Sequence, residues 1–180
     1  MVEAVLSFAE QLTKKVETAD TAVQSEQTGA AIKLFEEVIK EEVPTPDDLT
    51  DDAIRAKEQA TYKLAAIFRE KGLVEELINL TKTVLPLFVD FPKSKLAKIT
   101  RTLFDLAMKV EGRHQQLVEL CEHIIAWCEQ ENRSFLRMRI ETNLADLNFK
   151  LQKYNDSITI LNKLTYELKK KEDKQLLVES

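Results

Sequence analysis

A turn-forming segment recurs along this chain at a constant spacing, and this repeat constrains the fold more than any other feature. The segments EKGLVEELINL (70–80), VEGRHQQLVEL (110–120) and KLQKYNDSITI (150–160) align with their turn positions 40 residues apart. Each joins two stretches whose apolar residues recur at helical spacing. Self-similarity at a fixed period indicates stacked units, none of which buries its apolar face alone. We therefore predict an all-α protein, a right-handed α-solenoid of tetratricopeptide-like helix pairs with a period near 40.

Six residues occupy the repeat positions of these units. The two turn glycines are Gly72 and Gly112, and the apolar positions that follow them are Leu77 and Leu117. In the last unit the same places fall at Gln152 and Ser157, and the aromatic Tyr154 lies between them. In tetratricopeptide-type pairs an aromatic after the turn wedges between the two helices, and a small residue three positions on lets them cross closely. We predict a buried Tyr154 ring and a close helix crossing at Ser157.

The apolar spacing predicts eight helices and the start of a ninth near Glu172. Proline at 44 and 46 ends the second helix, and Thr50 or Asp51 can cap the third. We expect an acidic N-terminal helix pair over 1–43, a linker over 44–50 and the solenoid over 51–180. The expected helices span 2–19, 27–43, 51–70, 73–89, 93–111, 114–131, 134–151 and 154–170.

Charge and hydropathy argue against several classes of function. Residues 1–50 hold 11 acidic and 4 basic side chains, whereas residues 51–180 hold 20 and 22. This distribution gives no general affinity for nucleic acid. The longest apolar run, Val84 to Val89, is interrupted by proline and far too short to span a membrane. Two cysteines without a disulfide framework suit a reducing compartment, so we expect a soluble cytoplasmic and nuclear protein.

Candidate catalytic and metal-binding residues are few. His114, Cys121 and Cys128 share one stripe of a predicted helix at intervals of seven residues. Seven helical residues rise about 10.5 Å, whereas zinc ligands lie about 2.0–2.3 Å from the metal. We therefore interpret both cysteines as core residues. The chain also lacks a glycine-rich phosphate loop and a nucleophile motif, so we expect no enzyme, no cofactor and no small-molecule substrate.

Basic residues near position 100 form the candidate docking site for a partner protein. Lys95, Lys98 and Arg101 lie close together along one face of a predicted helix, with Lys93 nearby. Such a face can bind an acidic partner, although a solvated face is the alternative. A second segment, NRSFLRMRIE (132–141), combines arginines with Phe135, which is typical of interfaces. Packing between helices explains its apolar residues equally well.

Three segments resemble a known family. They are IRAKEQATYKLAAIFREKGLVEEL (54–77), SKLAKITRTLFDL (94–106) and the stretch from 135 to 179. They are similar to 26S proteasome non-ATPase regulatory subunit 11, the lid subunit also called regulatory particle non-ATPase subunit six. The most specific pieces are the series Arg55, Lys57, Glu58 and Gln59, the FLR triplet at 135–137, and ELKKKEDKQLLVE (167–179).

The resemblance implies a scaffold that acts in ubiquitin-dependent protein degradation. Members of the family have an N-terminal α-solenoid followed by a PCI module with a winged helix. They brace the lid of the regulatory particle against the ATPase ring and the outer α-ring of the core particle. The implied partners are lid subunits, ATPase subunits and core α-subunits. The role is structural, so no catalytic residue is carried over. We expect this chain to be the N-terminal part, ending before the PCI module.

Two other scaffolding or binding functions remain as alternatives. One is a scaffold that resembles subunit two of the COP9 signalosome. The other is a free-standing tetratricopeptide-type adaptor that binds peptide termini. Such an adaptor needs several Lys, Arg and Asn side chains converging on a carboxylate. Asn143 and Lys150 share one predicted helix, but the preceding units contain no matching set.

Overall fold

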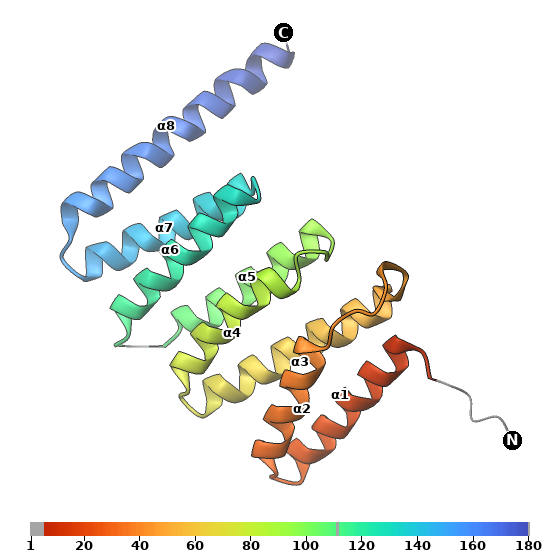
Figure 1. The fold of residues 1–180 in the computed structure, drawn as a ribbon. Coiled ribbons are helices and arrows are strands. Elements are labelled where there is room, and N and C mark those ends of the chain that lie inside the picture. The colour runs from red at the N-terminus through yellow and green to blue at the C-terminus, as the bar shows by residue number, and fades with distance from the viewer. Residues whose placement is uncertain (1–5, 111, 180) are drawn as a thin grey trace, which may run out of the picture. The chain divides into compact units, whose positions relative to one another are not determined.

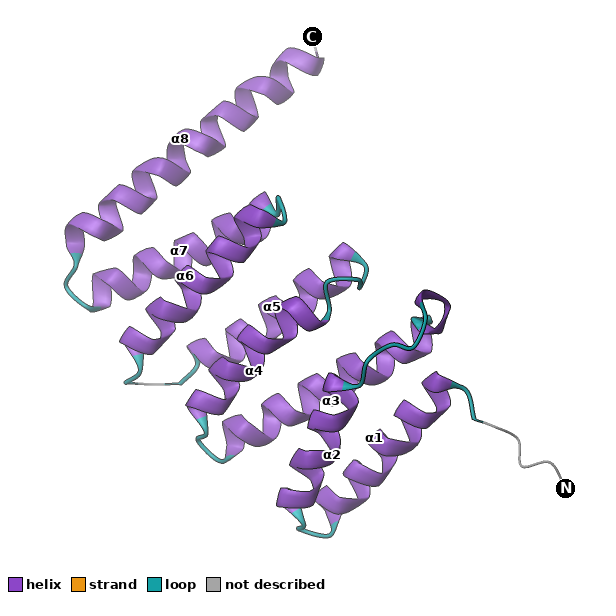
Figure 2. Cartoon of the chain, viewed as in Figure 1, coloured by secondary structure: helices purple, strands orange, loops and turns teal. Residues whose placement is uncertain are grey.

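The computed structural model describes residues 6–110 and 112–179, and the side chains within them up to residue 171. The described residues form α-helices and one short 3-10 helix, with no strand among them (Figures 1 and 2). The predicted all-α class is confirmed, and this series of helices is consistent with an α-solenoid. The elements are α1 Phe8–Gln24, α2 Thr28–Lys40, η1 Pro46–Asp48, α3 Asp51–Glu70, α4 Val74–Leu87, α5 Lys93–Met108, α6 His114–Gln130, α7 Ser134–Lys150 and α8 Tyr154–Glu179.

The chain divides into two compact units, Met1–Lys109 and Val110–Ser180. In the first unit α1, α2 and α3 pack against one another, and α3 also packs against α4 and α5. In the second unit α7 packs against both α6 and α8. The division into residues 1–43, 44–50 and 51–180 stays a prediction. No described helix has the length and hydropathy required to cross a membrane.

Side-chain caps fix where α1 and α3 begin. Ser7 Oγ accepts a hydrogen bond from the Glu10 amide at 3.3 Å, and the Ser7 amide donates to Glu10 Oε2 at 2.8 Å. This reciprocal pair is a capping box, which satisfies two donors that the first helical turn leaves open. Thr50 Oγ1 accepts from the Ala53 amide at 3.3 Å. The predicted cap at Thr50 is confirmed.

The turns that follow α1, α3 and α7 share one backbone conformation. Each places a residue with positive φ just past the helix: Glu26 at 59°, Gly72 at 68° and Gln152 at 60°. The next amide then donates to a carbonyl five residues back, as Leu73 does to Phe68 at 2.8 Å and Lys153 to Asn148 at 2.8 Å. This is the Schellman arrangement. Gly112 also has positive φ, 76°, so both predicted turn glycines adopt the left-handed conformation. The 40-residue period itself stays a prediction.

Several predicted helix boundaries were wrong. The predicted ninth helix does not exist, because α8 continues to Glu179 without a break near Glu172. The sequence there, KKKEDK, holds neither glycine nor proline, so nothing in it interrupts a helix. The first helix begins at Phe8 and ends at Gln24, rather than spanning 2–19, and residues 2–5 of that prediction lie outside the described residues. The second helix ends at Lys40, three residues before its predicted end.

The repeat positions differ in how deeply they are buried. Leu77, Leu117 and Ser157 are all buried. Ser157 Oγ donates to the Ala145 carbonyl at 2.8 Å, so α8 crosses α7 closely at this small residue. Tyr154, in contrast, is 49% exposed. Its ring meets Phe149 edge to face, with 5.3 Å between centroids. The predicted burial of Tyr154 was wrong, because its ring rests on an exposed aromatic neighbour rather than between the helices.

Candidate protein interface

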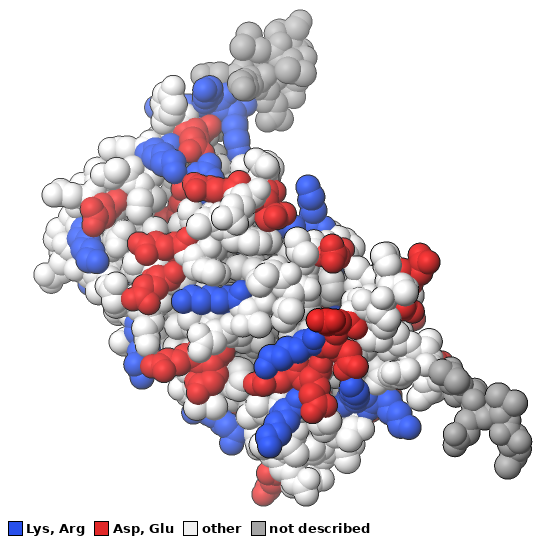
Figure 3. Space-filling model, in the orientation of Figure 1, with Lys and Arg blue, Asp and Glu red and all other residues white. Residues whose placement is uncertain are grey.

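Charged side chains are the most informative feature of this molecule beyond its core. On the face drawn in Figure 3, acidic and basic side chains are interspersed rather than separated by sign. Some of these charges reach inward, because the buried residues include Lys57, Glu58 and Glu141. A buried charge costs free energy unless it is paired and hydrogen-bonded. The partners of these three residues therefore indicate what each one does.

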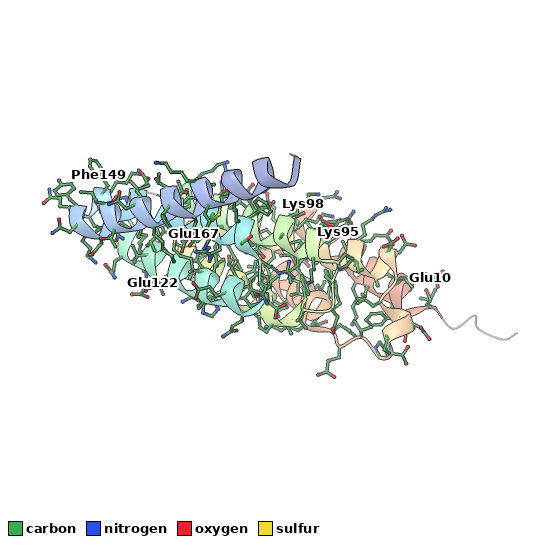
Figure 4. The ribbon with its side chains drawn as sticks, turned by 90° about the horizontal axis from the view of Figure 1, so that it is seen from above. Glu10, Lys95, Lys98, Glu122, Phe149 and Glu167 are labelled. Carbon is green, nitrogen blue, oxygen red and sulfur yellow. The ribbon has the colours of Figure 1, made fainter. Side chains whose placement is uncertain are left out.

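Two of the four predicted docking residues hold a buried carboxylate of their own chain. Lys95 Nζ donates to Glu58 Oε2 at 3.2 Å, and Lys98 Nζ donates to Glu58 Oε1 at 3.3 Å. Figure 4 shows both lysines as neighbours on α5. Glu58 lies on α3, so the three side chains join α3 to α5. Lys93 and Arg101 are exposed on the same helix. The structure therefore brings the basic residues together but gives Lys95 and Lys98 an internal role.

The environment of Glu58 favours its charged form. Burial alone opposes ionisation, but hydrogen bonds from Lys95, Tyr62 and Lys98 outweigh it and hold the pKa of Glu58 below its usual value. The Tyr62 hydroxyl donates to Glu58 Oε1 at 3.0 Å. Burial and the adjacent Glu58 charge raise the pKa of Tyr62 to about 12. At neutral pH the site therefore holds one carboxylate, two ammonium groups and a neutral phenol.

Lys57, the residue before Glu58, ties α3 to the end of α2. Its Nζ donates to the carbonyls of Val38 and Ile39 at 3.1 Å each, and also to the Glu41 carbonyl. These are among the carbonyls that the last turn of a helix leaves without a partner, and a cation is favourable at that end of the helix dipole. Burial lowers the pKa of Lys57 to about 8, despite the opposing charge of Glu41.

A second charged cluster joins α7 to α8. Glu141, buried on α7, accepts from Arg137 Nη1 with both carboxylate oxygens at 2.9 Å and from Lys163 Nζ at 3.0 Å. Arg137 also donates to Glu167 of α8, which Figure 4 labels. The hydrogen bond from Arg137 is the main cause that lowers the pKa of Glu167. Every charge in this cluster has an opposite charge beside it.

The FLR triplet divides between core, cluster and surface. Leu136 is buried, Arg137 belongs to the cluster with Glu141, and Phe135 is 81% exposed. Lys171 Nζ lies 4.8 Å from the centre of the Phe135 ring. Two explanations of this triplet were open, an interface or packing between helices. The structure places Leu136 in the packing between helices and leaves Phe135 on the surface.

The cysteines lie where the helical stripe predicted them, on the buried face of α6. Cys121 and Cys128 are both buried and free. Burial raises the pKa of Cys121 to about 12 and that of Cys128 to about 11. Such thiols are weak nucleophiles and weak metal ligands, because both roles need the thiolate. Within the described residues, no three His, Cys, Asp or Glu side chains gather as metal ligands would.

The roles of Lys57, Glu58 and Glu141 were not predicted from the sequence. Each is a charged residue at a position of helical apolar spacing, with buried residues three or four positions away on the same helix. A charge on an apolar stripe is a signal for a buried ion pair, and this signal was present in the sequence. Their partners on other helices lie 16 to 40 residues away along the chain, so no local pattern identifies those partners.

Comparison with known protein families decides the classification. The profile described as 26S proteasome regulatory subunit RPN6 N-terminal domain matches residues 12–151. The chain belongs to this family. The matched region of this RPN6 N-terminal domain includes Lys57, Glu58, Arg137 and Glu141, so the central residues of both charged clusters fall inside it.

Individual relatives agree with this classification. The probable 26S proteasome regulatory subunit rpn6 of Schizosaccharomyces pombe is 34% identical over 167 residues, which cover 91% of this chain and 38% of the relative. The 26S proteasome non-ATPase regulatory subunit 11 homolog of Arabidopsis thaliana is 32% identical, with 91% and 38% covered. The RPN6 of Saccharomyces cerevisiae is 29% identical, with 71% and 30% covered. The chain thus spans well under half the length of the curated relatives it matches.

Proposed function

We propose that this chain is part of a non-catalytic scaffold subunit of the 26S proteasome regulatory particle. The observation that carries the proposal is the match to the RPN6 N-terminal domain over most of the chain. The matched relatives are named as regulatory subunits of the 26S proteasome. In this role the protein acts in ubiquitin-dependent degradation in the cytoplasm and nucleus. It braces the lid against the ATPase ring and the core particle.

The internal use of charge supports a mechanism based on rigidity. Lys57, Glu58 and Glu141 all bind neighbouring helices of their own unit. Because each link crosses from one helix to another, it resists sliding of α2, α3 and α5 within the first unit and of α7 and α8 within the second. A scaffold needs such stiffness, since a flexible arm transmits no fixed spacing between its partners.

We propose Lys93, Lys95, Lys98 and Arg101 as the docking site for an acidic partner. Because Lys95 is half-buried and bound to Glu58, the exposed part of this surface is formed by Lys93, Lys98 and Arg101. We propose that long-range attraction from these residues, rather than tight individual ion pairs, contributes to docking. Exposed ion pairs are each worth about 0–1 kcal/mol, so several contacts within a large complex are required.

Affinity purification from the source cells tests the function. A tag is added to the full-length gene product in its own cells, and the proteins that purify with it are identified by mass spectrometry. Recovery of lid subunits, ATPases and core α-subunits together is the expected result. Recovery of COP9 signalosome subunits in their place, or of no assembly at all, would overturn the proposal.

A further inference from the structure

A groove lies between two loops of the first compact unit. Its walls are the α2–α3 connection, residues 41–50, and the α4–α5 connection, residues 88–92 (Figure 1). The groove has a volume of about 610 Å³. Seven apolar side chains line it: Ile39, Val43, Pro44, Pro46, Leu49, Leu87 and Phe91. We call this site the α2–α3 groove.

Large apolar side chains at this groove are open to water. Leu87, which lines it, is 43% exposed, and Val89, two residues on, is 48% exposed. Leu87 ends α4 and Val89 lies in the loop that follows, and two prolines of the facing loop, Pro44 and Pro46, are exposed as well. Clustered exposed apolar groups rimmed by polar residues mark interaction sites. The groove therefore has the shape and the lining to accept an apolar side chain from a partner.

The rim of the groove carries negative charge. Glu42 and Asp90 line it and are exposed, and neither forms an ion pair with another of the described residues. Lys40, the cation at the rim, pairs with Glu36 at 3.0 Å. On the face drawn in Figure 3, acidic side chains lie beside uncharged surface near these loops. Charge complementarity at such a rim selects partners and speeds their association.

The floor of the groove excludes a cation. Lys57 lines the groove, and its ammonium group already donates to three backbone carbonyls. It has three hydrogens, so no donor remains for a ligand. Its positive charge repels a second cation that approaches the floor. An occupant must therefore place an apolar group inside and keep its positive charge at the rim.

We propose that the α2–α3 groove binds a protein segment in which one or two large apolar side chains are flanked by lysine or arginine. The apolar side chain covers Leu87 and Phe91, and the flanking cations lie beside Glu42 and Asp90. This proposal does not rest on the proposed function, because it concerns only the shape and charge of the first unit.

A designed peptide tests the proposal. The probe is an amidated hexapeptide with two central leucines between Lys-Arg pairs, labelled for fluorescence anisotropy and added to the 180-residue chain. One matched peptide replaces both leucines with alanine, and another replaces the basic pairs with glutamates. Backbone amide chemical shifts measured during the titration locate the binding site.

The expected result is saturable binding of the leucine peptide with shifts confined to residues 41–50 and 87–91. Leu87→Ala and the pair Glu42→Lys/Asp90→Lys should each weaken binding at least tenfold. The control pair Glu70→Lys/Glu129→Lys, which changes net charge equally at exposed sites elsewhere, should stay within twofold of the wild type. Thermal melting confirms that each variant folds. Equal binding of the alanine peptide, tight binding of the glutamate peptide, or shifts centred elsewhere would overturn the proposal.

Discussion

Cys121 and Cys128 lie buried on α6, and burial raises the pKa of both thiols, to about 12 and about 11. The thiolate is the form that reacts with alkylating reagents. We therefore expect the folded protein to react with iodoacetamide at pH 8 about 100-fold more slowly than the urea-unfolded chain. Mass spectrometry of quenched time points measures both rates. Equal rates in the two states would show that the thiols are accessible in the folded protein.

The same thiols make stability depend on pH. Their pKa values in the folded state lie above the ordinary value of 9.0. Their contribution is therefore complete below pH 9 and is lost as pH rises through about 11 for Cys128 and about 12 for Cys121. Lys57 acts with the opposite sign, because its pKa of about 8 lies below the ordinary 10.5. Urea denaturation of the wild type and of Cys121→Ala/Cys128→Ala separates these effects. The wild type should lose stability relative to the variant between pH 9 and 10.5.

Ser157 should contribute more to the stability of the fold than Tyr154, although the larger aromatic residue would be expected to contribute more. Because the Tyr154 ring is half exposed and contacts Phe149, Tyr154→Ala should cost only about 1 kcal/mol, the value of an aromatic pair. Ser157 is buried at the helix crossing, so Ser157→Leu should cost about 1–3 kcal/mol through overpacking. Buried Leu147→Ala is the control on α7, at about 2–5 kcal/mol. Chemical denaturation measures all three, and a larger loss for Tyr154→Ala than for Ser157→Leu would contradict this assignment.

At the scale of the element, the turns that end the helices test how backbone conformation contributes to stability. Gly72 has a φ of 68°, and an added Cβ there meets no atom within 4 Å, so the cost of Gly72→Ala is purely conformational, about 1 kcal/mol. Gln152 has a φ of 60° in the corresponding turn, and Gln152→Gly should stabilise by about 0.5 kcal/mol.

Gly29 provides the control for these turn variants. It lies within α2, where an added Cβ also meets nothing within 4 Å. Gly29→Ala should therefore stabilise the protein by about 0.5–1 kcal/mol, the reverse of the effect at Gly72. Thermal and urea melts of the three variants give the comparison. Loss of stability in both glycine variants would mean that space, rather than φ, decides the outcome.

Buried ion pairs should contribute more to the free energy of unfolding than exposed ones. Arg137→Met leaves Glu141, which is buried, with Lys163 as its cation, and removes the arginine partner of Glu167. We expect a loss of about 2–4 kcal/mol, since breaking a buried pair leaves a charge poorly compensated. Lys150 and Asp146 form an exposed pair on the same helix at 2.7 Å. Lys150→Met should cost about 0.5 kcal/mol or less. Similar losses from the two variants, measured by urea denaturation, would argue against a special role for the buried cluster.

Local patterns predicted most elements of this fold but not the links between them. The helix over 51–70 and its cap at Thr50 follow from apolar spacing and one side chain. The position where α1 begins does not follow in the same way, because apolar residues at helical spacing also precede Ser7 in the sequence, and the capping box of Ser7 and Glu10 sets the start instead. Likewise, Lys95 and Lys98 were predicted to form a docking surface. Their partner, Glu58, lies 37 and 40 residues earlier in the sequence, so its contact with them could not be predicted. Contacts over such distances depend on how helices pack, which no window of residues contains.

At the scale of the whole molecule, the basic surface of α5 has two possible uses that one pair of variants can separate. Lys95→Gln/Lys98→Gln and Glu58→Gln both break the link between α3 and α5. Only the lysine variant removes positive charge from the surface. If the surface docks an acidic partner, the lysine variant should enter the assembled complex several-fold less efficiently than Glu58→Gln. If the two variants melt at similar temperatures, a loss of stability cannot explain a difference in how efficiently they enter the complex.

The comparison is made with tagged proteins in the source cells, by quantifying the lid, ATPase and core subunits that purify with each variant. The wild type sets the scale, and melting temperatures of the purified variants supply the correction for stability. Raising the salt concentration during purification should weaken the wild type towards the lysine variant, since attraction between exposed charges is screened over about 8–10 Å at physiological ionic strength. Equal incorporation of the two variants at matched stability would restrict Lys95 and Lys98 to the internal role that their contacts with Glu58 already give them.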